Sequence, residues 1–238
     1  MARRYDSEAA RKRILSASVR LFLECGYHGT TMAAILREAD VSSSTFQNIS
    51  GTKDGVLFEL LKLMFSGQFS AAGDAAALLG PNASPVFVYA FETSVQLTIV
   101  ELNEIIRYLY LQSYAAEQSL EYIRRNTAKQ LQLAFQRYNP EFTEEDFYQV
   151  DIGTSGIMLG YMLRPCSGDF TLSQKIGRYL EMSLGALNVP AEERAAVIAS
   201  IQQQDLRTIA KGVIARLFEA LADTFDFELE AQMFGEER

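Results

Sequence analysis

The segment Val41-Ser-Ser-Ser-Thr-Phe-Gln-Asn-Ile-Ser-Gly-Thr-Lys53 has the pattern of a short helix followed by the start of a second helix. Ser42 is a predicted N-cap for a helix over residues 43–49, and Thr52 is a predicted N-cap for the helix that follows. The short helix carries mostly small polar side chains and only two large apolar ones. A helix of this composition adds little to a core, so its role is expected to lie on its outer face.

Helical periodicity dominates the rest of the sequence. The five prolines fall between periodic segments, and runs of alternating β-branched residues are absent. The fold class is therefore expected to be all-α. Helices are predicted at about 7–25 (with Gly26 as C-cap), 32–39, 43–49, 53–72, 84–114 (as one helix or two), 117–138, 143–163, 171–187, 191–203 and 205–226.

Length and composition limit the class of protein. The chain has 238 residues, 48% of them hydrophobic, which is enough for one large domain or two small ones. No apolar run approaches the roughly 20 residues of a membrane span, and residues 1–6 do not resemble a secretory signal. Cys25 and Cys166 lie far apart and do not suggest a disulfide framework. We therefore expect a cytoplasmic protein with no membrane partner.

The sequence contains no recognisable catalytic or metal-binding set. A single histidine, His28, and two distant cysteines do not give zinc-ligand spacing, and no glycine-rich phosphate loop occurs. The acidic run at 144–146 fits a helix N-terminus better than a pair of catalytic carboxylates. We therefore expect a protein that is not an enzyme and that needs no metal or other cofactor.

Charge is distributed unevenly along the chain. Residues 1–54 hold eight Lys and Arg against six Asp and Glu, a net charge of +2, whereas residues 55–238 carry a net charge of −10. This difference fits a small nucleic-acid contact module on an acidic body, and it also fits ordinary variation. The first basic residues are either an arm that reaches DNA or a solvated helix start: Arg3, Arg4, Arg11, Lys12 and Arg13.

The predicted helices at 32–39 and 43–49, with a tight turn at Asp40 and Val41 between them, form a helix-turn-helix. Ile35 and Val41 supply the apolar contacts that set the crossing of the two helices. In such a pair the second helix enters the major groove of DNA. A close approach requires small side chains that form hydrogen bonds, and the helix at 43–49 has them. Taken without its neighbours, the same helix also fits a merely solvated surface helix.

The predicted DNA contacts fall into two groups. Gln and Asn side chains on the second helix bond adenine edges, and Ser or Thr reach bases or phosphates. Hydroxyls, amides and a lysine at helix starts receive phosphate. The predicted contact residues are Thr30, Thr31, Ser42, Ser43, Ser44, Thr45, Gln47, Asn48, Thr52 and Lys53.

Three stretches of the sequence resemble the DNA-binding domain of the TetR family of bacterial transcriptional regulators. They are RILSASVRLFLECGYHGTTM (13–32), VSSSTF (41–46) and TKDGVL (52–57). The resemblance covers about residues 8–60 and includes spacing as well as residue type. It implies an all-helical homodimer in which an N-terminal helix-turn-helix binds a near-palindromic operator in double-stranded DNA. It also implies a larger C-terminal domain whose small-molecule effector lowers operator affinity.

The sequence departs from the family pattern at several positions. Asp40 stands where the turn usually has glycine, and it adopts the left-handed conformation at modest cost. Leu36 and Ser44 replace smaller residues. The second helix usually ends in Tyr-x-x-Phe, whereas this chain has Gln47 and Ser50 at those two positions. We expect Phe46 and Ile49 to take over the anchoring that the usual phenylalanine provides.

These observations predict two domains and one leading function. Residues 1–54 are expected to form the three-helix DNA-binding domain, with the helix from residue 53 as connector, and residues 55–238 the helical effector-binding and dimerisation domain. The function expected from the resemblance is a ligand-responsive transcriptional regulator, a repressor. The alternative is a helical ligand-binding or interaction protein whose DNA-binding head has decayed.

Two further sets of residues are expected in the C-terminal part. Aromatic residues, with polar ones among them, suit a pocket for an aromatic or amphipathic ligand, although ordinary core packing explains most such residues. The pocket set is Tyr89, Thr93, Gln96, Arg107, Tyr110, Tyr114 and Tyr161. The resemblance places the dimer interface on the last long helices, here including Leu180, Leu184, Leu217, Phe218 and Leu221. Gly153, Gly156 and Gly160 share a helical face that suits close packing, either within the body or between two chains.

Overall fold

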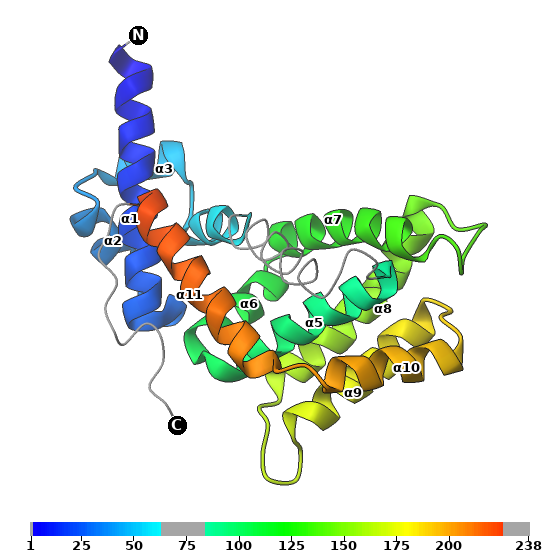
Figure 1. The fold of residues 1–238 in the computed structure, drawn as a ribbon. Coiled ribbons are helices and arrows are strands. Elements are labelled where there is room, and N and C mark those ends of the chain that lie inside the picture. Colours follow the sequence, from blue (N-terminus) through cyan, green and yellow to red (C-terminus); the bar gives the residue numbers. More distant parts are fainter. Residues whose placement is uncertain (1, 63–83, 226–238) are drawn as a thin grey trace.

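A computed structural model of the chain describes residues 2–62 and 84–225 (Figure 1). The described residues form helices and no β-strand, apart from an isolated bridge between Ser167 and Phe170. The predicted all-α class is therefore confirmed. The helices are α1 (Ala2–Gly29), α2 (Met32–Glu38), α3 (Ser43–Ile49), an unlabelled helix at 53–62, α5 (Pro85–Leu102), α6 (Glu104–Ala115), α7 (Glu117–Phe135), α8 (Glu144–Leu163), α9 (Leu172–Ala186), α10 (Ala191–Gln202) and α11 (Leu206–Phe225).

The helix ends follow the capping signals in the sequence. Gly26 has a φ of 71° and interrupts α1 where a C-cap was predicted. Asn103 has an extended backbone, which divides the predicted segment 84–114 into α5 and α6, and its side chain accepts a hydrogen bond from the amide of Ile106. The predicted helix at 53–72 is described only as far as residue 62. None of the described helices is long and apolar enough to cross a membrane.

Helix α5 is the centre of the body. It contacts α6, α7, α8, α9, α10 and α11, so it is covered on nearly every side. Its residues Leu97, Thr98, Ile99 and Val100 are consecutive and all buried, which is expected of a helix that is apolar around its whole circumference. The buried hydroxyl of Thr98 donates to the carbonyl of Ser94, one turn earlier, and so needs no partner outside the helix.

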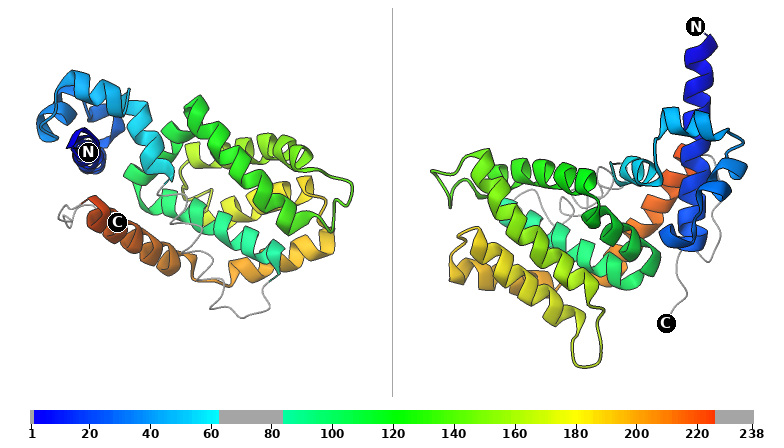
Figure 2. Two further views of the ribbon diagram at one scale, coloured as in Figure 1. Left: turned by 90° about the horizontal axis from the view of Figure 1, so that it is seen from above. Right: turned by 180° about the vertical axis from the view of Figure 1, so that it is seen from behind.

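Helix α1 joins the N-terminal helices to the body. It packs on α2 and α3 and also on α6 and α11. In two further views α1, α2 and α3 stand at one end of the molecule, and α11 runs from the body back to α1 (Figure 2). The buried side chains Ile14, Phe22, Ile35 and Phe46 belong to the same hydrophobic cluster as the core of the body. The side chains of the helix-turn-helix are therefore in continuous packing contact with those of the body.

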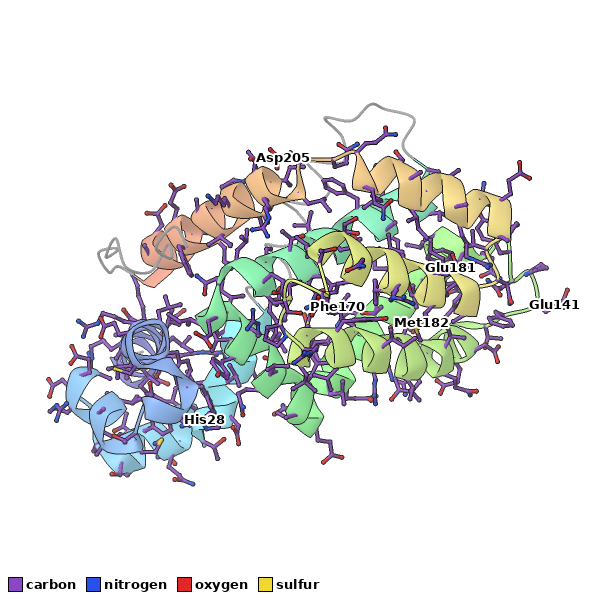
Figure 3. All side chains as sticks on the ribbon, turned by 90° about the horizontal axis from the view of Figure 1, so that it is seen from below. His28, Glu141, Phe170, Glu181, Met182 and Asp205 are labelled. Carbon is purple, nitrogen blue, oxygen red and sulfur yellow. The ribbon has the colours of Figure 1, made fainter. Side chains whose placement is uncertain are left out.

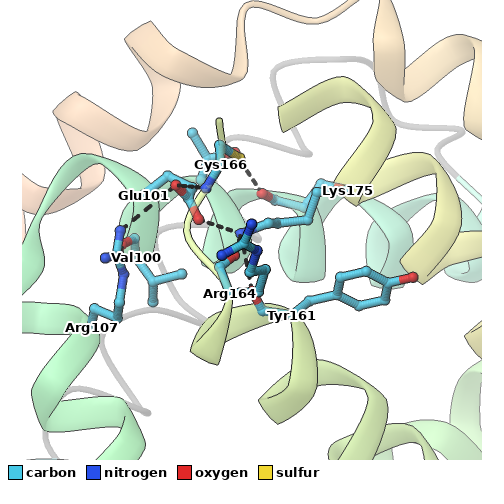
Figure 4. Close-up of polar contacts among 9 residues, drawn as sticks. Val100, Glu101, Arg107, Tyr161, Arg164, Cys166 and Lys175 are labelled. Carbon is cyan, nitrogen blue, oxygen red and sulfur yellow. Dashed lines mark hydrogen bonds and ion pairs between the residues drawn. The ribbon is translucent and has the colours of Figure 1, made fainter. Parts of the chain in front are cut away.

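A buried lysine binds several groups near the end of α8 (Figure 4). Lys175 of α9 is fully buried, and its Nζ donates to the carbonyls of Tyr161 and Arg164 at 3.0 and 2.5 Å. It also forms an ion pair with Glu101, which accepts from the amide of Cys166 at 3.0 Å. Because a buried charge is stable only when its partners satisfy it, this cluster fixes the loop between α8 and α9 against the end of α5.

Gly55 marks the closest approach of the helix at 53–62 to the end of α3. A Cβ atom at this position would overlap the carbonyl oxygen of Ser50, which is backbone and has little freedom to move away. We predict that Gly55→Ala lowers the free energy of unfolding by about 1–3 kcal/mol, as overpacking does.

The matched control is Gly212→Ala on α11, where an added Cβ meets nothing within 4 Å. There the substitution should raise stability by about 0.5–1 kcal/mol, because alanine loses less backbone entropy than glycine in a helix. Urea unfolding of both variants measures the difference. Equal effects of the two substitutions would contradict the close contact at Gly55.

Candidate DNA-binding surface and ligand pocket

Helix α3 presents a polar outer face and has a single buried residue. Phe46 is 1% exposed and packs into the core, whereas Ile49 is half-buried. Four side chains of α3 are exposed and share its outward side: Ser43, Ser44, Gln47 and Asn48. These side chains can form hydrogen bonds with the base edges in a major groove.

The start of α3 is fixed by a cluster of hydroxyl groups. Ser42 is the N-cap, and its Oγ accepts from the amide of Thr45 at 3.1 Å. The same Oγ lies 2.9 Å from the hydroxyls of Ser44 and Thr45. Asp40, in the turn before it, has a φ of 48°, which is the left-handed conformation that was expected there. The turn and cap together set the direction in which α3 leaves α2.

Two other predicted contact residues lie at exposed helix starts. Thr31 caps α2 by accepting from the amide of Ala34 at 3.1 Å, and Thr52 accepts from the amide of Gly55 at 3.1 Å. Both residues are exposed. Free amides and hydroxyls at a helix start are suited to a phosphate group, so the geometry of these two residues agrees with the expected role.

Thr30 and Lys53 have a different role from the one expected. Thr30 is 2% exposed, and its hydroxyl donates to the carbonyls of Leu21 and Gly26 inside the domain. Lys53 Nζ donates to the carbonyls of Tyr27 and Thr30 at 2.8 and 3.0 Å. Both side chains therefore satisfy carbonyl groups at the end of α1. The expectation that Thr30 contacts DNA is corrected by its burial, and Lys53 is engaged within the domain.

Several of the N-terminal basic residues also have partners within the chain. Arg13 donates to the carbonyl of Ala39 at the end of α2, and Arg11 forms an ion pair with Glu59 at 2.8 Å. Arg20 is paired with Glu38. These contacts join α1 to the helices around it. Arg11 and Arg13 therefore connect α1 to neighbouring helices, instead of forming a DNA-binding arm or a solvated helix start. Arg3 and Arg4 lie in the segment whose side chains are not described.

A cavity of about 370 Å³ opens in the body, lined by residues of α5, α6, α7, α8 and α9. Four residues of the predicted pocket set line it: Tyr89, Thr93, Gln96 and Tyr114. Val88, Ile123, Leu131 and Met158 give it apolar walls. Its volume lies within the range of cavities that hold small molecules, and its mixture of apolar walls with a few polar groups is typical of such sites.

Three residues of the predicted pocket set do not line the cavity. Arg107 donates to the carbonyl of Val100 at 2.7 Å and lies 3.6 Å from the carboxylate of Glu101. Tyr110 is buried in α6, and Tyr161 contacts the sulfur of Met182 at 3.8 Å. Their polar or aromatic character serves packing and ion pairing, which the residue types alone did not distinguish from a ligand site.

The sequence interpretation missed the acidic residues of the cavity. Asp151 on α8 and Glu92 on α5 both line it, as does Tyr179 on α9. Asp151 is the buried carboxylate on the inward face of α8, at helical spacing with Phe147, Thr154 and Met158. A charged residue at a core position of this pattern is the signal that would have marked it.

Asp151 is buried with one oxygen unpaired. It is 4% exposed, its Oδ1 accepts from Thr154 Oγ1 at 3.0 Å, and its Oδ2 has no hydrogen-bond partner among the described residues. Burial raises the pKa of Asp151 to about 6, against the opposing effects of the Thr154 bond and of the Arg124 charge. The carboxyl group therefore titrates close to neutral pH.

Tyrosine hydroxyls surround the acidic end of the cavity. Those of Tyr89 and Tyr179 lie 3.1 Å apart, and the Tyr114 hydroxyl is hydrogen-bonded to Gln96. Burial raises the pKa of Tyr89 to about 12, and it also raises the pKa values of Tyr114 and Tyr179 well above their ordinary value. All three phenols therefore stay neutral, and they offer aromatic surface and hydrogen bonds but no positive charge.

The leucines expected at the dimer interface lie elsewhere. Leu180, Leu184 and Phe218 are each at most 1% exposed and belong to the core of their own chain, so they are not available to a second chain. Leu217 is half-buried, and the side chain of Leu221 lies outside the described residues. This part of the interface expectation is corrected, because α9 packs on α5, α8 and α10 and α11 packs on α5 and α1.

A different apolar surface is exposed, on the outer side of α8 and α9. Ile152 and Leu163 are 45% and 60% exposed at either end of an α8 face that also carries Gly153, Gly156 and Gly160. An added Cβ at any of these three glycines would meet nothing within 4 Å. Met182 of α9, labelled in Figure 3, is 51% exposed, and its sulfur contacts the hydroxyl of Tyr161 on α8 at 3.8 Å.

The helix-turn-helix thus has the shape of a DNA-binding domain, and comparison with known proteins assigns its class. Residues 14–60 match the family described as "Bacterial regulatory proteins, tetR family". The HTH-type transcriptional regulator HbdR of Aromatoleum sp. (strain CIB) is 46% identical over 55 residues, which are 23% of this chain and 24% of the relative. No solved structure gives a significant match. The N-terminal region is therefore a helix-turn-helix domain of the tetR family of transcription regulators, as the sequence predicted.

The similarity ends with that domain. The aligned region spans about a quarter of the length of the relative, so the C-terminal body has to be interpreted from its own residues. Within the described residues, no group of three or more His, Cys, Asp and Glu side chains has the arrangement of a metal site. The cavity is then the feature of the body that most resembles a binding site.

Glu92 allows a test of the cavity by pH. Its pKa is raised to about 7 by burial, so the folded state binds this proton more tightly than the unfolded state does. Its contribution to stability is present at pH values below about 4.5 and is lost as the pH rises through 7. We predict that Glu92→Gln stabilises the protein by about 1–3 kcal/mol at pH 8 and not at pH 5.

Denaturant unfolding at the two pH values measures this difference. Glu141→Gln, in the exposed connection before α8, is the control (Figure 3). A Glu92→Gln effect that is the same at pH 5 and pH 8 would show that this carboxyl group is not buried in the cavity.

Proposed function

We propose that this protein is a ligand-responsive transcriptional repressor that acts in the cytoplasm as a dimer on a near-palindromic operator. The observation that carries the proposal is a tetR-type helix-turn-helix whose α3 leaves its polar face free, joined through α1 to a body with a cavity. The two proposed units are residues 1–54, which bind DNA, and residues 55–238, which bind the effector and the second chain.

The proposed DNA contacts follow the exposed face of the domain. Gln47 and Asn48 would read base edges, with Ser43 and Ser44 beside them. Thr31, Ser42, Thr45 and Thr52 would contact phosphates from the helix starts. Lys53 supports this arrangement from within, because it holds the end of α1.

The proposed dimer uses the outer face of α8 and α9. A surface with isolated large apolar side chains beside three glycines allows another helix to approach closely. In a two-fold dimer this face would meet its own copy, so Gly156 of one chain would lie near α8 of the other. Burial of Ile152, Leu163 and Met182 would then remove from water the largest exposed apolar side chains of this region.

The proposed response to a ligand travels through α6 and α11. Helix α6 contributes Tyr114 to the cavity and packs on α1, where Gln112 lies 3.0 Å from His28. Helix α11 packs on both α5 and α1. A ligand that shifts α5 or α6 therefore changes the support of α1, and through it the spacing of two α3 helices in a dimer. Repression follows if the ligand-free spacing fits DNA.

The base-reading role of α3 is tested with a duplex selected from a random library by the wild-type protein. We predict that Gln47→Ala changes the preferred sequence and loses about 1–3 kcal/mol of discrimination at one base pair of each half-site. The control is Gln118→Ala on the exposed side of α7, which should leave selection unchanged. If the folded wild-type protein enriches no sequence, the alternative is favoured, in which the N-terminal domain no longer binds DNA. Ser50, at the position where the family usually has phenylalanine, is the sequence feature that suggests this alternative.

The dimer is tested with a charge on the proposed seam. Gly156→Glu should convert the protein from dimer to monomer in sedimentation at micromolar concentration, because it places a carboxylate in an apolar contact. Gly212→Glu, on the exposed side of α11, is the control and should remain dimeric. Loss of the dimer only in Gly212→Glu would move the interface to α11 and contradict the proposed seam.

A further inference from the structure

The described residues that line the cavity include no lysine or arginine, so its acidic end has no basic side chain beside it. Two carboxyl groups, those of Asp151 and Glu92, line the same cavity. Asp151 is more than nine-tenths buried, and its Oδ2 is without a hydrogen-bond partner in the part of the chain that the structure describes. A buried carboxylate oxygen without a donor is unfavourable by itself, so its presence on a cavity wall points to a donor that arrives with a ligand.

The groups around Asp151 include no positively charged partner in an ion pair with it among the described residues. Tyr89 of α5, Tyr114 of α6 and Tyr179 of α9 are close enough to interact with its charge, and all three are neutral phenols. Arg124 of α7 is the positive charge that acts on it, yet no ion pair joins the two side chains within the described residues, and Arg124 Nε is itself buried there without a hydrogen-bond partner. Arg124 itself is not among the residues that line the cavity.

We propose that the cavity binds an amphipathic amine, with its protonated nitrogen at Asp151 and its apolar body along the walls of α5, α7 and α8. This inference rests on the proposed function, because it names the effector class of that same site. An ammonium group donates three hydrogen bonds and accepts none, so it suits Asp151 Oδ2 and neighbouring phenol oxygens. The tyrosine rings add aromatic surface of the kind that attracts cations.

The opposite ligand charge is disfavoured by the same residues. A carboxylate ligand would enter a cavity that already contains two carboxyl groups and would leave Asp151 Oδ2 unsatisfied. A neutral alcohol can donate one hydrogen bond to that oxygen but brings no compensating charge. The apolar walls contributed by Val88, Ile123, Leu131 and Met158 accept the body of any of these ligands, so the charge of the head group is what discriminates between them.

Proton release on binding gives the proposal a second signature. Burial raises the pKa of Asp151 to about 6 and that of Glu92 to about 7, so part of each group is protonated near neutral pH. A cation binds the ionised carboxylate, and binding therefore releases a proton. The groups that interact with the charge of Asp151 are Arg124, Tyr89, Tyr114 and Tyr179, and the three phenols stay neutral between pH 5 and pH 7.5. Glu92 lines the same cavity and loses its proton in this range, so it adds to the pH dependence.

The experiment uses three probes with the same phenyl-alkyl body, measured by calorimetry on the full chain. They are 4-phenylbutylamine, 4-phenylbutan-1-ol and 4-phenylbutanoate. We expect the amine to bind at least tenfold more tightly than the alcohol at pH 7.5, and the carboxylate to bind most weakly. The affinity of the amine should fall about tenfold between pH 7.5 and pH 5, whereas that of the alcohol should not fall.

Variants then locate the nitrogen. Asp151→Asn should lower amine affinity at least tenfold, reduce its pH dependence to the part that Glu92 contributes, and change alcohol affinity by less than threefold. Asp169→Asn, on the exposed loop before α9, is the control and should change nothing. The pH series on the wild-type protein needs no variant, so it decides the question even if Asp151→Asn does not fold. Equal binding of amine and alcohol, or tightest binding of the carboxylate, would overturn the proposal.

A parallel titration separates this inference from the proposed function. The fluorescence anisotropy of a labelled selected duplex is followed as 4-phenylbutylamine is added. Amine binding with the expected pH dependence, but without release of DNA, would support the ligand class and contradict the ligand-responsive function. Release of DNA by the carboxylate and not by the amine would support a ligand-responsive regulator and overturn the ligand class.

Discussion

Helix α3 has to keep its outer face free of the rest of the chain, and the arrangement of the N-terminal helices follows from that constraint. Only Phe46 holds it fully from the core side. The remaining support comes from its ends: the hydroxyl cluster at Ser42, the left-handed turn at Asp40 and the glycine contact between residues 50 and 55. Helix α1 supports these contacts. The backbone carbonyl groups near its end accept hydrogen bonds from the side chains of Thr30 and Lys53.

The body reverses this arrangement, since it encloses polar groups instead of presenting them. Helix α5 is buried on nearly all sides, and the cavity beside it contains Asp151, one of whose carboxylate oxygens has no hydrogen-bond partner among the described residues. Lys175 and Glu101, in contrast, are ion-paired, and Lys175 also donates to a backbone carbonyl. The contrast between the paired charges of Lys175 and Glu101 and the unpaired carboxylate oxygen of Asp151 is the physical basis for treating the cavity as a binding site.

The sequence predicted the helices well, because caps, prolines and helical periodicity are local signals. Asp40, Ser42 and Thr52 behave as their residue types indicate. The sequence predicted partners less well, because partners are set by packing between distant segments. Thr30 and Arg107 resemble ligand-binding residues in sequence but bond carbonyl groups of their own chain, and Leu180 lies in the core. Asp151 stands at a core position of the α8 pattern, but its position beside Glu92 and Tyr179 depends on the packing of α5, α8 and α9.

We propose that two copies of α3 enter successive major grooves of one duplex. Hydroxyl-radical footprinting of the wild-type protein on a selected duplex tests this most directly. We expect two symmetrical protected patches whose centres lie about one helical turn, or a whole multiple of it, apart. Protection in one patch only, or protection spread evenly along the duplex by a folded protein, would contradict binding by two α3 helices.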